Sequence, residues 1–275
     1  LVITDSGLGG LAICAGIEMA LRLRAVAVPP RITYVNAWPE EGRGYNDLPD
    51  MAARAAALDR ALGAIDTMAP DHVVIACNTL SIVYAHTAHR RRAQVPVHGI
   101  VDAGVAMFAS ALTQSPASAL VLVGTRTTIE SAVHAGALVG RGFDPRRVAG
   151  ASCHGLATAI EGDPFGRDTD AAIDACCARA AAAAPEGTPL HVGLCCTHYG
   201  FVRPRIESAL ARHARRPVVA LDPNARLARD VVSRLTSAVG AAVAADTCPP
   251  AVPVTMVSKV TLPDAKRRNV ASVVQ

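Results

Sequence analysis

The sequence predicts an α/β protein with two similar domains, each built on a mainly parallel sheet flanked by helices. Short apolar runs typical of buried strands alternate with helix-length stretches along the chain. The order strand, loop, helix, strand, cysteine loop occurs twice. Both repeats end alike, because the strands expected at 73–76 and 190–195 lead into polar loops that carry Cys77 and Cys196. Ligands bind at the carboxyl ends of such strands, so both loops are candidate site segments.

The first repeat occupies roughly the first hundred residues. Strands are expected at 1–5, 32–35, 73–76 and 96–100, and helices after a glycine turn at 7–10, at 51–68 and at 81–92. The polar segment 40–50 between them is rich in Gly and Pro. It is a candidate substrate-facing loop.

The second repeat begins with a helix near 104–112. Next are expected a strand at 119–123, a threonine loop at 124–128 and a segment at 157–161 that precedes a Gly-Asp-Pro turn. A helix at 169–184, a strand at 190–195, a helix at 204–212, a strand at 218–221 and a helix at 225–235 follow. The threonines open a helix, where hydroxyl groups cap the backbone and also bind anions. Residues after Pro249 show no informative pattern.

Composition argues against several classes of protein. The net charge is +4, but the arginines are scattered and aromatic residues make up only 3%, so no nucleic-acid surface is expected. No apolar run approaches the ~20 residues that cross a bilayer, and residues 1–4 read as a strand rather than a secretion signal. A soluble cytoplasmic protein without membrane partners is therefore expected.

Two common cofactors are also disfavoured. Lysine occurs only at Lys259 and Lys266, beyond every motif, which argues against pyridoxal phosphate bound as a Schiff base. The turn Gly7-x-Gly9-x-x-Ala12 matches a dinucleotide fingerprint, but the next strand ends at Asn36 rather than at an acid. The sequence therefore disfavours both pyridoxal phosphate and a dinucleotide.

The eight cysteines are expected to be free thiols, as is usual in the cytosol. Cys77 and Cys196 stand out because polar residues surround them. Cys195 precedes Cys196 in a strand, where neighbours point to opposite faces, so Cys195 is assigned to packing. The remaining five are expected to be small apolar residues in a core or near a surface: Cys14, Cys153, Cys176, Cys177 and Cys248.

Three motifs in register carry a family resemblance: residues 5–11 (DSGLGGL), 76–79 (ACNT) and 196–199 (CTHY). Together they resemble the cofactor-independent aspartate/glutamate racemases, most closely the glutamate racemases, from the first residues to about Val231. The resemblance implies two domains related by a pseudo-twofold axis, with the active site in the cleft between them. It assigns residues 1–99 and 212–275 to a discontinuous first domain and 100–211 to the second. The oligomeric state stays open, with a homodimer as one option.

The resemblance implies an isomerase that interconverts L- and D-glutamate and supplies D-glutamate for peptidoglycan. Inversion at Cα needs one acid–base group on each face, and a thiol suits this because its ordinary pKa is ~8.5. The catalytic residues implied are Cys77, Cys196, Asp5, His198 and Glu161, with no metal. The substrate contacts implied are Asp5, Ser6, Tyr45, Asn46, Asn78, Thr79, Thr128, Thr197 and His198.

Several alternatives stay open. Asp5 and Ser6 also suit a helix cap, and Glu161 suits a solvated turn. Glutamate racemases have a Pro-Tyr-Gly loop where this chain has Gly44-Tyr45-Asn46, which leaves aspartate or another small amino acid as an alternative substrate. An inactive racemase-like binding protein is a further alternative. A structural zinc site is another, with its ligands drawn from Cys153, His154, His191, Cys195, Cys196 and His198.

Overall fold

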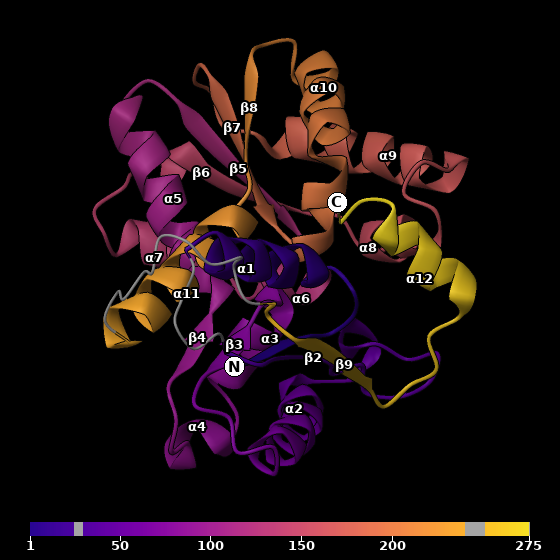
Figure 1. The fold of residues 1–275 in the computed structure, drawn as a ribbon. Coiled ribbons are helices and arrows are strands. Elements are labelled where there is room, and N and C mark those ends of the chain that lie inside the picture. Colours follow the sequence, from indigo (N-terminus) through magenta and orange to yellow (C-terminus); the bar gives the residue numbers. More distant parts are fainter. Residues whose placement is uncertain (25–29, 240–250, 275) are drawn as a thin grey trace. The chain divides into compact units, whose positions relative to one another are not determined.

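The computed structural model of the protein describes residues 1–24, 30–239 and 251–274 (Figure 1). It divides into two compact units, one formed by residues 1–100 and 224–261 and the other by residues 101–223 and 262–275. The domain boundaries that the resemblance implies, 1–99 with 212–275 and 100–211, stay a prediction.

The first unit holds a five-stranded sheet whose strands are all parallel, in the order β4-β3-β1-β2-β9. Its strands are β1 (Val2–Asp5), β2 (Ile32–Asn36), β3 (Val73–Ile75), β4 (Val97–Gly99) and β9 (Val254–Ser258). The first four confirm the expected apolar runs. The tail strand β9 was not expected, because it lies at the sheet edge with mostly exposed side chains.

Helices of the first unit follow the expected order with one break. They are α1 (Leu11–Leu23), α2 (Met51–Asp66), α3 (Asn78–Tyr84), α4 (His89–Arg92) and α11 (Asn224–Val239), with a short 3₁₀ helix η1 (Tyr45–Asp47). The single helix expected at 81–92 is instead two, α3 and α4. The carboxylate of Asp59 accepts hydrogen bonds from the backbone N–H groups of Ala88 and His89, so it caps the second helix.

The second unit holds a four-stranded parallel sheet in the order β6-β5-β7-β8. Its strands are β5 (Ala119–Gly124), β6 (Val148–Ser152), β7 (Leu190–Cys195) and β8 (Val218–Leu221). Every residue of β5 and β7 is buried, which is why both strands read as unbroken apolar runs. The edge strand β6 is only partly buried and was missed.

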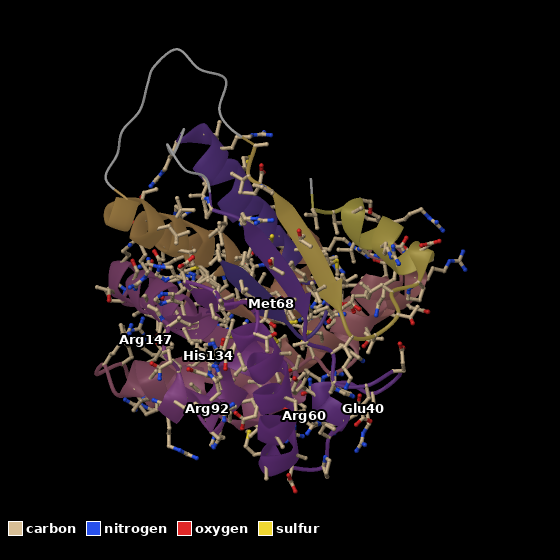
Figure 2. All side chains as sticks on the ribbon, turned by 60° about the horizontal axis from the view of Figure 1, so that its bottom comes forward. Glu40, Arg60, Met68, Arg92, His134 and Arg147 are labelled. Carbon is tan, nitrogen blue, oxygen red and sulfur yellow. A yellow bond between two sulfur atoms is a disulfide. The ribbon has the colours of Figure 1, made fainter. Side chains whose placement is uncertain are left out.

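Helices cover the second sheet and connect its strands. They are α5 (Ile100–Gln114), α6 (Arg126–Glu130), α7 (Val133–Val139), α8 (Leu156–Gly162), α9 (Arg167–Ala183), α10 (Arg203–Ala214) and α12 (Asp264–Ala271), with 3₁₀ helices η2 (Pro145–Arg147) and η3 (Thr197–Val202). Arg147, labelled in Figure 2, donates to the backbone carbonyl oxygens of Leu112, Ser115 and Ser118. This one side chain therefore joins the ends of α5 and β6.

The two sheets repeat one another strand for strand. The order β4-β3-β1-β2 of the first matches β8-β7-β5-β6 of the second, and β9 is an addition to the first. Cys77 follows β3 and Cys196 follows β7, so the two thiols occupy corresponding places in the two sheets. The internal repeat and the fold class expected from the sequence are thus confirmed.

The remaining cysteines divide into two kinds. Cys153 and Cys176 form a disulfide between the end of β6 and α9, so the expectation of free thiols was wrong for this pair. Cys14 and Cys177 are buried free thiols as expected, and burial raises their pKa values to about 11 and about 12. Cys248 lies outside the described residues.

Within the described ranges, no helix is both long and apolar enough to span a membrane.

Candidate active site

Cys77 lies where β3 meets α3 and is 7% exposed. It is the N-cap of α3, and its sulfur accepts a hydrogen bond from the backbone N–H of Leu80 at 3.5 Å. The hydroxyl of Ser6 lies 3.2 Å from the same sulfur. Because β1 and β3 are neighbouring parallel strands, the loop after β1 brings Ser6 to Cys77. Hydrogen-bond donors and a helix N-terminus favour the thiolate form of a cysteine.

Asp5 ends β1 and is fully buried. The N-cap residue of α1 is Gly10. A Cβ atom at Gly10 would lie 2.7 Å from the Asp5 carboxylate and 3.0 Å from the Cβ atom of Ala76. A glycine is therefore needed where the start of α1 closes on Asp5.

Asn78 and Thr79 open α3 and are both buried. Within the described part of the chain, neither the oxygen nor the nitrogen of the Asn78 amide has a hydrogen-bond partner. Buried amides normally have such partners, so this side chain offers a donor and an acceptor beside Cys77.

The loop that differs from the glutamate racemase pattern is anchored from α2. Arg54 donates hydrogen bonds to the carbonyl oxygens of Tyr45 and Leu48. Tyr45 is buried, and burial together with the charge of Cys77 raises the pKa of its hydroxyl above the usual range. Asn46 is half-buried. These predicted contacts therefore share the unit of Cys77.

Cys195 and Cys196 face opposite sides of the second sheet. Cys195 packs in the apolar cluster that contains Phe108, Leu120 and Leu122, whereas Cys196 packs in the cluster of Val121. Burial, and then the charge of Cys196, raises the pKa of the Cys195 thiol far above its usual value. Cys195 is thus a packing residue, as the alternation of side chains along a strand predicts.

Cys196 begins a chain of polar contacts. Its sulfur lies 3.7 Å from Nδ1 of His198, and Nε2 of His198 lies 2.6 Å from Oε1 of Glu161. Glu161 is buried in the last turn of α8 and is not a solvated turn residue. The end of β7 and the helix α8 therefore bring together three of the catalytic residues that the resemblance implies: Cys196, His198 and Glu161.

Charges along this chain stabilise one another. Burial acts to lower the pKa of His198, but its hydrogen bonds to Cys196 and Glu161 and their negative charges raise it well above 6.5. Burial acts to raise the pKa of Glu161, but the hydrogen bond and charge of His198, with those of Lys266, lower it to about 2. At neutral pH the arrangement favours an imidazolium between a carboxylate and the sulfur of Cys196.

Threonines complete the second set. Thr125 is the N-cap of α6, and its hydroxyl lies 3.0 Å from that of Thr128. Capping, the structural role expected for this loop, is thus confirmed for Thr125. Thr128 and Thr197 are both buried, Thr197 directly after Cys196.

Sequence reasoning missed Lys266. Its ammonium group in α12 forms an ion pair with Oε2 of Glu161. The lysine had been placed beyond every motif, in a tail without pattern, and only the packing of α12 against α8 brings it to the site.

Ligands proposed for a structural zinc site are not gathered in one place. Cys153 is tied to Cys176, and Cys195 and Cys196 belong to opposite faces of the sheet. Among the described residues, no group of three or more His, Cys, Asp or Glu side chains is arranged to hold a metal ion.

Known proteins resemble this chain in sequence. The family model for Asp/Glu/hydantoin racemases matches residues 8–231. A glutamate racemase of Desulforudis audaxviator is 26% identical over 225 residues, which cover 82% of this chain and 75% of that protein. A glutamate racemase of Campylobacter jejuni subsp. jejuni is 40% identical over 73 residues, which cover 26% of this chain and 28% of that protein.

Solved structures resemble it in fold. The crystal structure of glutamate racemase from Campylobacter jejuni superposes with a TM-score of 0.75 at 19% identity, covering 99% of this chain and 97% of that one. The glutamate racemase of Francisella tularensis in complex with D-glutamate gives 0.71 at 19% identity, covering 99% and 92%. The fold is therefore that of the glutamate racemase structures, and, because the family model spans most of its length, this chain belongs to the Asp/Glu/hydantoin racemase family of isomerases.

Proposed function

We propose that this protein is an amino-acid racemase that interconverts L- and D-glutamate without a cofactor, with Cys77 and Cys196 as the two acid–base groups. One observation carries the proposal. Each of two corresponding strand ends, after β3 and after β7, presents a thiol with its own polar partners. Inversion of a carbon centre requires two such groups, one for each face.

The reaction divides into two proton transfers. In one direction the thiolate of Cys77 takes the Cα proton, and the thiol of Cys196 delivers a different proton to the opposite face. In the other direction the roles are exchanged. After the first transfer both sulfurs are thiols and the substrate is a carbanion. After the second, Cys77 is a thiol and Cys196 a thiolate, so a completed turnover leaves the enzyme ready for the reverse direction. The proposal does not assign the L-to-D direction to either thiol.

The surroundings of Cys77 support a thiolate there. The N–H of Leu80 and the hydroxyl of Ser6 both approach its sulfur. We assign Asp5, buried at the end of the adjacent strand, to tuning or relaying protons at this sulfur. A buried carboxylate and a thiolate repel one another, and the positive ammonium group of an incoming amino acid would reduce that repulsion.

The surroundings of Cys196 support both of its protonation states. The imidazolium of His198 stabilises the thiolate left when Cys196 has given up its proton, and Glu161 stabilises the imidazolium. A thiol next to a histidine held by a carboxylate can therefore act as acid in one direction and base in the other.

Substrate contacts are assigned to hydroxyl, amide and backbone N–H groups. Ser6, Asn78 and Thr79 belong to the Cys77 side, with Tyr45 and Asn46 of the loop after β2. Thr128, Thr197 and His198 belong to the Cys196 side. Such donors suit two carboxylate groups and the negative charge that builds up at Cα in the transition state.

The product suggests a role. The glutamate racemases that this chain resembles imply that D-glutamate goes to peptidoglycan, and we extend that role to this protein.

Circular dichroism tests the proposal. Purified protein, dialysed against a chelator, is incubated separately with L- and D-glutamate and with L- and D-aspartate. The circular dichroism signal of glutamate is expected to decay to zero from either enantiomer, because racemisation yields an equal mixture of the two. Stable signals from all four amino acids would reject the proposal and favour a binding protein with a racemase fold.

Aspartate is the second candidate substrate, because of the loop at 44–46. The natural test of this loop is Asn46→Gly, which restores the glycine of the glutamate racemase pattern. We expect the ratio of glutamate to aspartate turnover to rise in this variant. An unchanged ratio would mean that Asn46 does not set specificity.

Restoring the proline of that pattern is a poorer test. The backbone N–H of Gly44 donates to the carboxylate of Asp47 at 2.8 Å, and proline lacks this donor. A Cβ atom at Gly44 would also lie 2.9 Å from the ring of Trp38. Gly44→Pro would therefore disturb the loop itself, and any change in specificity would be confounded.

A further inference from the structure

We infer that Lys266 is a positioning residue of the Cys196 site: its ammonium group holds one oxygen of Glu161 so that the other oxygen faces His198. The inference rests on the proposed function for its catalytic consequence, but not for the contact itself. It concerns a side chain that no motif of the family resemblance contains.

The two oxygens of Glu161 have different partners. Oε1 lies 2.6 Å from Nε2 of His198, and Oε2 forms the ion pair with Lys266. A carboxylate bound at only one oxygen can rotate about its last side-chain bond. Because both oxygens are bound here, on opposite sides, the plane of the carboxylate is fixed and with it the direction of the bond to His198.

Burial makes this second partner necessary. Glu161 is almost fully buried, and an ionised carboxylate in such a place is costly unless its lone pairs are satisfied. Two cationic groups face it, His198 on η3 and Lys266 on α12. Without the lysine, the carboxylate of Glu161 would keep its contact with the His198 imidazolium, but Oε2 would lose its ion pair.

The helix that carries Lys266 is docked at this place by other contacts. α12 packs against α8, and Figure 1 shows the two helices side by side. The side-chain amide of Asn269 donates to the carbonyl oxygen of Gly162, the residue after Glu161. Val270 on α12 is buried. Lys266 therefore reaches Glu161 from a helix that is seated on the same turn of α8.

The contacts form one path from the tail to the reacting thiol: Lys266, Glu161, His198, Cys196. Lys266 is separated from the sulfur by two residues in this path, so it acts on the chemistry only through them. Loss of the lysine is expected to lower kcat and to leave KM nearly unchanged, because a loosened His198 affects proton transfer more than substrate binding.

The experiment compares Lys266→Met with Lys266→Arg and with Arg267→Met. Methionine keeps most of the aliphatic stem and removes the charge, whereas arginine keeps the charge. Arg267 is the next residue of the same helix, is exposed, and pairs with Asp264 rather than with Glu161, so Arg267→Met is a matched loss of one positive charge. Lys266→Gln serves as a second neutral variant, and far-ultraviolet circular dichroism confirms that each variant is folded.

The first readout does not depend on racemisation. Carbon-13 NMR follows the side-chain carboxyl of Glu161, assigned with Glu161→Gln, as the pH is lowered. In Lys266→Met its titration is expected to move towards pH 4.5 by about one unit, since one positive charge and one hydrogen bond that favour the carboxylate are lost. Lys266→Arg and Arg267→Met are expected to titrate like the unmodified protein.

The second readout is racemisation at neutral pH. Lys266→Met is expected to lose about tenfold in kcat, the equivalent of one pKa unit of lost stabilisation, and Lys266→Arg to recover most of it. An unchanged Glu161 titration in Lys266→Met would overturn the inference. So would a shifted titration with an unchanged kcat. If the unmodified protein racemises no amino acid, the proposed function fails, and the titration alone decides whether Lys266 holds Glu161.

Discussion

Cys195 and Cys196 are neighbours in the chain, yet their side chains belong to different apolar clusters on the two faces of the second sheet. Only Cys196 lies within hydrogen-bond distance of His198. Two thiols joined by one peptide bond thus differ completely in their surroundings, and this difference makes them a matched pair for mutagenesis.

The first prediction uses that pair. Cys196→Ala removes the thiol held by His198, so racemisation is expected to fall by several orders of magnitude. Cys195→Ala removes a buried sulfur from an apolar cluster and is expected to cost about 1–2 kcal/mol of stability with little change in kcat. Circular dichroism of glutamate measures the rate, and urea unfolding measures the stability. Inactive Cys195→Ala beside active Cys196→Ala would reverse the assignment of the two thiols.

The second prediction concerns the glycine beside Asp5. Gly10→Ala places a Cβ atom 2.7 Å from the carboxylate, so either Asp5 or the start of α1 must move. The variant is expected to lose about 1–3 kcal/mol of stability and to racemise slowly, because the surroundings of Ser6 and Cys77 depend on this loop.

Gly63→Ala is the control for that variant. Gly63 lies within α2, and a Cβ atom there would meet nothing within 4 Å. Alanine is the better helix former, so this substitution is expected to stabilise the protein by about 0.5–1 kcal/mol at full activity. Equal activity in Gly10→Ala and Gly63→Ala would show that Asp5 needs no close packing against α1.

Sequence patterns predicted the parts of the fold that burial dictates. The strands β5 and β7 are buried along their whole length, so their apolar runs marked them almost to the residue. The edge strand β9 exposes most of its side chains and the edge strand β6 is only partly buried, so neither has an unbroken apolar run. Periodicity detects an element only where one face or both must be apolar.

Local patterns also singled out Cys77 and Cys196, and the family resemblance implied Ser6 and His198 as site residues. The structure places Ser6 beside Cys77 and His198 beside Cys196. Sequence patterns said nothing about the role of Lys266, because α12 and α8 are far apart in the sequence and no local pattern connects them. The disulfide between Cys153 and Cys176 was missed for the same reason. Contacts between elements that are distant in the sequence can be identified only from the folded structure, because no local sequence pattern records them.

The third prediction is a pH dependence of stability. The pKa of Glu161 is lowered in the folded protein from 4.5 to about 2. Its ionisation therefore favours the folded state above pH 4.5, and this contribution is lost as the pH falls towards 2. Between pH 6 and pH 3 the loss amounts to about 2 kcal/mol. Urea unfolding at several pH values measures it.

Glu161→Gln is the comparison for that experiment. Glutamine has no charge to lose, so the stability of this variant is expected to fall less steeply over the same pH range. Its stability at pH 6 is expected to be lower, because His198 loses its anionic partner. Parallel pH curves for the two proteins would contradict the lowered pKa of Glu161.

The last prediction separates the two faces of the substrate. Cys77→Ser and Cys196→Ser each replace a thiol by a hydroxyl whose pKa is far too high for this chemistry, so inversion is expected to fall by several orders of magnitude in both. Each variant keeps one thiol, and that thiol can still remove the Cα proton from its own face. A glutamate analogue with a leaving group at Cβ or on nitrogen then loses the group after proton removal, without any need for the second thiol. Chiral chromatography of the remaining analogue should show that Cys77→Ser consumes one enantiomer and Cys196→Ser the other. Consumption of the same enantiomer by both variants would mean that the two thiols do not act on opposite faces, and full racemisation by either variant would exclude the two-thiol mechanism.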